Sequence, residues 1–96
     1  MGEPERTIIQ HAVWIRNGED EPVLLCIEPW ASETRLAGGK ECLVVFEGPS
    51  GKWPGIEWSK DRITAYGWSG STASVYLEGE LILDCPTKVP PMPEPQ

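Results

Sequence analysis

The chain has 96 residues, enough for one domain, and its 15 Asp and Glu against 8 Lys and Arg give a net charge of −7. An acidic chain repels phosphate backbones, so we expect no nucleic acid among its partners. No stretch approaches the roughly 18–20 apolar residues of a membrane-spanning helix, and residues 1–6 lack the features of a secretion signal. These observations predict a cytoplasmic protein that makes no use of a membrane. Ten glycines and ten prolines argue against a mainly helical fold.

The cysteines also favour a cytoplasmic location. Cys26, Cys42 and Cys85 are widely spaced, odd in number, and each lies in or beside an apolar run. Small secreted domains are usually cross-linked by an even number of cysteines. We therefore expect three buried, reduced thiols.

Apolar residues recur with a period of two along most of the chain, which is typical of β-strands. The runs 23–27 and 41–47 are apolar on both faces and predict central strands. Residues 32–36 are compatible with a short helical turn capped by Ser32 or with an extended edge segment, and the neighbouring strands favour the extended form. Strands are predicted at residues 7–16, 23–27, 41–47, 56–59, 62–68, 71–77 and 81–83.

Seven or eight short strands, with turns roughly every 8–12 residues, predict an all-β fold. We expect a small two-layer β-sandwich or a partly open barrel, jelly-roll-like in character. The predicted organisation is a flexible N-terminus (1–6), a single β-domain (7–85) and a disordered tail (86–96) that holds five of the ten prolines. The predicted core consists of Leu25, Ile27, Val44, Phe46, Val75 and Leu77.

Candidate catalytic and metal-binding residues are few. His11 is the only histidine, in a predicted strand where we expect it half-buried, and there is no Cys-x-x-Cys pair, so we expect no metal and no cofactor. The remaining catalytic hypothesis is a hydrolase that uses Glu47 and Glu57, one on each side of the loop 48–55. Such acids need a desolvated pocket, which a domain this small rarely builds. A function without catalysis is therefore preferred.

Tryptophan is the residue type that exceeds expectation, with five in 96 residues. Tryptophan suits protein interfaces and sugar-stacking platforms because it combines a large apolar area with one hydrogen-bond donor. A hairpin is predicted over residues 62–77, turning at Ser69-Gly70. If the loop of this hairpin has an even number of residues, Tyr66 and Trp68 point into the core. A loop with an odd number of residues is favoured, because it separates polar from apolar side chains better. Its polar face would carry Thr64, Tyr66, Trp68, Thr72, Ser74 and Tyr76.

The candidate binding residues are accordingly aromatic: Trp30, Tyr66, Trp68 and Tyr76. The preferred function is a non-enzymatic domain, monomeric or homodimeric, that binds an unknown protein partner through an exposed aromatic surface. The alternative is carbohydrate or small-ligand binding on a platform of Tyr66, Trp68 and Tyr76. The third hypothesis is the hydrolase described above.

Two strings carry a family resemblance: Glu-Pro-Trp at residues 28–30 and Tyr-Gly-Trp-Ser-Gly-Ser at residues 66–71. With them, residues 23–83 resemble a group of small bacterial proteins that have no assigned activity. The resemblance implies a compact bacterial β-domain. It implies no mechanism and transfers no functional residue.

Overall fold

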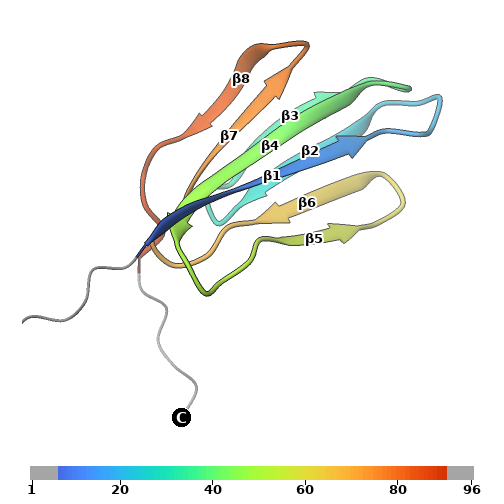
Figure 1. Cartoon of the computed structure of the whole chain (residues 1–96). Helices are drawn as coiled ribbons and strands as arrows, with labels where there is room; N and C mark the ends of the chain where they lie inside the picture. The colour runs from blue at the N-terminus through green and yellow to red at the C-terminus, as the bar shows by residue number, and fades with distance from the viewer. Residues whose placement is uncertain (1–6, 91–96) are drawn as a thin grey trace, which may run out of the picture.

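A computed structural model describes residues 7–90, which form two stacked four-stranded sheets (Figure 1). The first sheet has the order β1-β4-β7-β8 and the second has the order β3-β2-β6-β5. The two sheets do not close into a barrel, so the β-sandwich is confirmed and the barrel alternative is wrong. The strands are β1 (Ile8–Arg16), β2 (Val23–Glu28), β3 (Ser32–Leu36), β4 (Glu41–Pro49), β5 (Gly55–Trp58), β6 (Arg62–Tyr66), β7 (Thr72–Leu77) and β8 (Glu80–Cys85).

The two runs predicted as central strands take central positions. β4 pairs antiparallel with β1 on one side and with β7 on the other. β2 lies between β3, which is antiparallel to it, and β6, which is parallel. β3 confirms the extended form for residues 32–36, because pairing with β2 satisfies backbone groups that an isolated helical turn would leave open.

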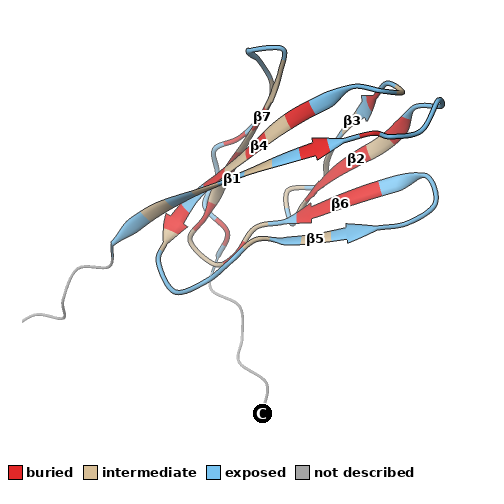
Figure 2. Ribbon diagram, turned by 45° about the vertical axis from the view of Figure 1, so that its right-hand side comes forward, coloured by how far each residue is buried: buried red, intermediate tan, exposed pale blue. Residues whose placement is uncertain are grey.

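The core lies between the sheets and is filled by alternate residues of each strand. Five predicted core residues are completely buried, and Leu77 is half-buried against the same cluster. Full burial of one such aliphatic or aromatic side chain contributes about 1.5–3 kcal/mol. In Figure 2 most of the buried segments lie on the middle strands, whereas the edge strand β5 is mostly exposed. The five fully buried residues are Leu25, Ile27, Val44, Phe46 and Val75.

The predicted hairpin over residues 62–77 is wrong. β6 belongs to the second sheet, between β2 and β5, whereas β7 belongs to the first sheet, between β4 and β8. Residues 67–71 cross from one sheet to the other, and we call this segment the crossover. In β6 and β7 the inner face is apolar and the outer face carries hydroxyl-bearing side chains, as predicted. That alternation is equally satisfied by two strands paired side by side and by two strands facing each other across a core, so it does not select the pairing.

The packed part of the chain continues beyond the predicted boundary at residue 85. Val89 is buried and exchanges backbone hydrogen bonds with the crossover, accepting one from Gly70 N–H at 2.8 Å and donating one to the Ser71 carbonyl at 3.0 Å. Residues 86–90 are therefore held against the domain. The predicted flexible segment 1–6 and the rest of the predicted tail, 91–96, lie outside the described residues.

All three cysteines are buried and unpaired, as predicted. Burial raises the pKa of the Cys42 thiol from its ordinary 9.0 to about 11, because the thiolate would lie among apolar side chains. A pKa that is higher in the folded state gives a stabilising contribution that is complete below pH 9.0 and is lost as the pH rises towards 11.

Two measurements check this prediction. In native protein at mildly alkaline pH, we expect an aromatic disulfide reagent to titrate the core thiols of Cys42 and Cys85 slowly, and to titrate all three thiols quickly in guanidinium chloride. The free energy of unfolding should fall above pH 9.0, and less steeply in Cys42→Ala. Rapid labelling of Cys42 in the native protein, or an identical pH dependence in the variant, would contradict the prediction.

Candidate functional site

The four aromatic residues predicted to bind a ligand do not share one surface. Tyr66 lies on the outer face of the second sheet and Tyr76 on the outer face of the first, on opposite sides of the sandwich. Trp30 is half-buried just after β2, and Trp68 is only 6% exposed. The predicted stacking platform of Tyr66, Trp68 and Tyr76 is therefore wrong, because it depended on the hairpin that does not form.

Trp68 is a core residue. Its indole N–H donates to the Pro49 carbonyl at 2.9 Å. The ring centroid lies 6.0 Å from that of Phe46 and 5.5 Å from that of His11, which is half-buried in β1 as predicted. The crossover places the Trp68 side chain at the end of the sandwich, where it covers the core between the two sheets.

Trp30 has a similar structural role at the same end of the domain. Its indole N–H donates to the Thr87 carbonyl at 2.6 Å, which fixes the segment after β8. The six-membered ring lies directly over Gly67, where an added Cβ would come within 2.5 Å of a ring carbon. The hydroxyl of the buried Ser71 accepts a hydrogen bond from the backbone N–H of Trp68 at 2.8 Å and donates one to the backbone carbonyl of Trp68 at 2.6 Å. The crossover is thus held by packing and hydrogen bonds.

The other three tryptophans are exposed: Trp14 by 65%, Trp53 by 74% and Trp58 by 60%. None of the three is among the predicted binding residues. For Trp14 a signal was present, because it alternates with Val13 and Ile15 in a strand whose inner face they occupy. The period of two places Trp14 on the outer face.

The outer face of the first sheet carries a row of large apolar side chains that crosses all four strands. Trp14 on β1 is opposite Leu43 on β4, and Leu43 is opposite Tyr76 on β7. Tyr76 is in turn opposite Leu81 on β8, which is 51% exposed. Side chains directly opposite each other on one face of a sheet are about 4.5–5.5 Å apart at Cβ, so the row is continuous. We call Trp14, Leu43, Tyr76 and Leu81 the apolar row.

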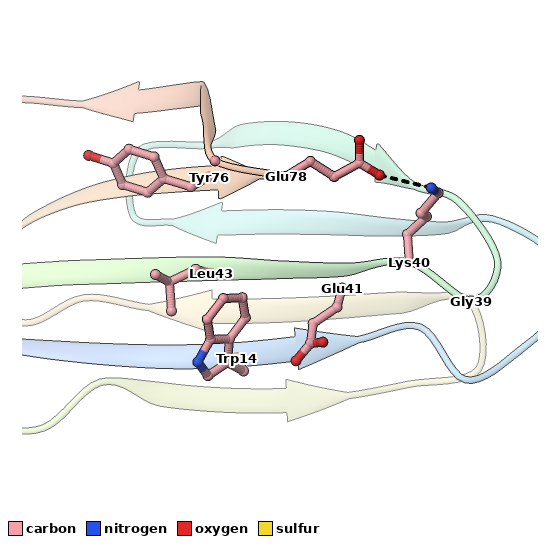
Figure 3. Close-up of a pocket in the computed structure, with 8 residues that line it drawn as sticks. Trp14, Gly39, Lys40, Glu41, Leu43, Tyr76 and Glu78 are labelled. Atoms are coloured by element: carbon pink, nitrogen blue, oxygen red, sulfur yellow. Dashed lines mark hydrogen bonds and ion pairs between the residues drawn. The ribbon is translucent and has the colours of Figure 1, made fainter.

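A hollow of about 520 Å³ is lined by three residues of the apolar row, Trp14, Leu43 and Tyr76. Figure 3 shows Trp14 and Tyr76 projecting on either side of Leu43. Charged residues stand at the end of the hollow nearest the turns, where Lys40 Nζ and Glu78 Oε1 are 2.9 Å apart. The hydrogen bond between them lowers the pKa of Glu78 and raises that of Lys40, so both stay charged at neutral pH. The hollow therefore has an aromatic and aliphatic lining with a charged end.

A second hollow, of about 620 Å³, lies on the outer face of the second sheet and is mainly polar. Tyr66 and Glu57 line it, together with Cys26 and Thr64. Glu47 projects instead from β4 in the first sheet, where it accepts a hydrogen bond from the Gln10 amide at 3.0 Å. The predicted pairing of Glu47 with Glu57 is therefore wrong, because Glu47 lies on the outer face of the first sheet and Glu57 on the outer face of the second.

Within residues 7–90, no three His, Cys, Asp or Glu side chains are grouped so that they could hold a metal ion. The same residues include no helix of the length and apolarity that would span a membrane. Comparisons with protein-family models, with curated proteins and with solved structures found no match to this chain.

Proposed function

We propose that this chain is a non-enzymatic protein-interaction domain that binds its partner through the apolar row. The observation that carries the proposal is the continuity of large apolar side chains across four strands on a solvent-facing surface. Outer faces of antiparallel sheets are usually polar. Extended apolar surface of this kind marks interaction sites on folded domains.

The composition around the row also supports a protein partner. Protein interfaces have cores enriched in tyrosine and tryptophan, with charged residues at the rim. Here Trp14 and Tyr76 flank Leu43, while Lys40 and Glu78 stand at the margin of the hollow. Ala12 and Val45 form the next cross-strand pair and extend the apolar area. The carbohydrate alternative is weakened, because the three aromatic residues on which it was based lie apart.

The proposal predicts that peptides selected on the protein will depend on Trp14. Random phage-displayed peptides would be selected on the wild type, and their affinities measured for Trp14→Ser and for Trp58→Ser as the matched control. The two tryptophans are similarly exposed, at 65% and 60%, so neither change should unfold the domain. We expect Trp14→Ser to weaken binding by about tenfold or more, as tryptophan does at the centre of an interface.

Two outcomes would contradict the proposal. The first is a set of selected peptides that bind Trp14→Ser as well as the wild type. The second is specific binding on a glycan array that Trp14→Ser abolishes, which would assign the row to carbohydrate instead.

A further inference from the structure

β1 is the one long edge strand of the described sandwich that lacks structural protection against pairing with another strand. Natural sheets protect their edges by short strands, charged side chains, prolines or bulges. Among the other edge strands, β5 has four residues, β3 alternates charged side chains over five residues, and β8 carries a register shift against β7. β1 has nine residues in unbroken register with β4, contains no proline, and has a single charged residue, Arg16, at its end.

Alternate residues of β1 form backbone hydrogen bonds with β4, and this alternation shows which backbone groups of β1 are free. Ser50 N–H donates to the Thr7 carbonyl and Asn17 N–H donates to the Lys40 carbonyl, both at 2.8 Å, in register with the β1–β4 ladder. The odd residues of β1 therefore bond to β4, and the even residues turn their N–H and C=O groups to the free edge. Among residues 7–90, no loop or turn backbone hydrogen bond reaches these even residues. They are Ile8, Gln10, Ala12, Trp14 and Arg16.

Exposed aromatic side chains gather on the same side of the sandwich. β3 and β8 contact each other at one side of the sandwich, and β1 and β5 are the end strands on the other side. Trp14 lies on β1 and Trp58 on β5, and the Trp53 ring contacts His11 of β1 at a centroid distance of 4.8 Å. Trp14 thus projects from the unpaired edge strand itself, and Trp53 lies against it.

We infer that β1 pairs antiparallel with β1 of a second copy of this chain, about a two-fold axis at Ala12. In this register Ala12 lies opposite Ala12 of the second copy, Gln10 opposite Trp14, and Ile8 opposite Arg16. The five even residues of each copy meet the even residues of the other, so five pairs exchange about ten hydrogen bonds. The two first sheets become one continuous sheet.

The fit of β1 to itself favours a second copy over a foreign strand. In this register inner residues meet inner residues, with Ile9 opposite Ile15 and His11 opposite Val13, so the apolar alternation continues across the junction. The only charge on the strand, Arg16, meets Ile8 and not another Arg16. The apolar rows of the two copies lie on one face of the joined sheet. The pairing itself rests on the free edge and is independent of the proposed function.

Sedimentation equilibrium over micromolar to submillimolar protein tests the pairing, with Ala12→Lys as the variant and Ala12→Thr as its matched control. Ala12 is exposed, so both variants should fold. Lysine places two like charges opposite each other at the axis, and we expect the dimer dissociation constant to rise about tenfold or more. Threonine should leave it nearly unchanged. Lysine also lowers the net negative charge of each copy. If general repulsion between the copies controlled association, Ala12→Lys would lower the dissociation constant instead. A wild type that stays monomeric, or a dimer unaffected by Ala12→Lys, would overturn the inference.

Cross-linking tests the register. Opposed hydrogen-bonded residues have Cα atoms about 5.5 Å apart, within the range of a disulfide. Ala12→Cys should therefore form a covalent dimer on mild oxidation, and wild-type protein oxidised in the same way shows whether the native thiols contribute. Asp84→Cys, at an exposed position on the far edge strand, should stay monomeric under the same conditions. Equal cross-linking of the two variants would rule out the axis at Ala12.

Discussion

Replacing Trp68 by alanine is expected to lower the free energy of unfolding by about 3–5 kcal/mol, the cost of removing a large buried aromatic side chain. The change leaves a cavity beside Phe46 and His11, and it deprives the Pro49 carbonyl of its indole donor. Domains of this size are stable by only about 5–15 kcal/mol, so the loss is a large part of the total. Guanidinium denaturation followed by circular dichroism measures it.

Trp58→Ala is the matched control, because it removes the same side chain from a position that is 60% exposed. Its effect should stay within about 0.5 kcal/mol, as for other surface substitutions. Trp68→Phe should fall between the two, since it keeps ring contacts but loses the hydrogen bond to Pro49. If Trp68→Ala and Trp58→Ala cost the same, the placement of Trp68 in the core would be refuted.

Gly67→Ala is expected to cost about 1–3 kcal/mol through overpacking, although it adds only one methyl group. The new Cβ would lie 2.5 Å from a ring carbon of Trp30 and 2.6 Å from the Ser71 hydroxyl oxygen. The hydroxyl cannot withdraw without losing its two hydrogen bonds to Trp68, and Trp30 is tied to the Thr87 carbonyl. Denaturation of the purified variant gives the magnitude.

Gly18→Ala is the corresponding control, since nothing lies within 4 Å of its added Cβ. It should be neutral or slightly stabilising. A second test combines Gly67→Ala with Trp30→Leu. If the ring of Trp30 causes the clash, the double variant should be more stable than the sum of the two single losses predicts. Strict additivity would show that the methyl group does not meet Trp30.

The string Tyr-Gly-Trp-Ser-Gly-Ser at residues 66–71 is explained by the crossover. Gly67 leaves room for Trp30, and Trp68 fills the end of the core. Gly70 adopts a left-handed φ of 84°. Ser71 bonds the backbone of Trp68 from a completely buried position. The most distinctive stretch of the chain therefore has a structural role, which accounts for its serine and aromatic content without a ligand.

Much of the fold could be predicted from the sequence, because the relevant physics is local. The alternation of side chains predicts where each strand lies and which of its faces is buried, as along residues 72–77. Runs that are apolar on both faces, such as 41–47, predict central strands. The same rule placed five core residues correctly and His11 at a half-buried position. The rule did not predict the burial of Trp68, because Trp68 lies in the crossover and not in a strand.

The tertiary structure decided which strands pair, because pairing joins segments that are distant in the sequence. It placed β6 and β7 in different sheets and so separated Tyr66 from Tyr76. It buried Trp68 by means of the crossover, and it aligned Trp14 with Leu43 across the β1–β4 ladder. A row of side chains across four strands arises only once every register is set. The sequence by itself therefore determined the strands and their inner faces, whereas the surface that we propose for binding was decided by how those strands assemble.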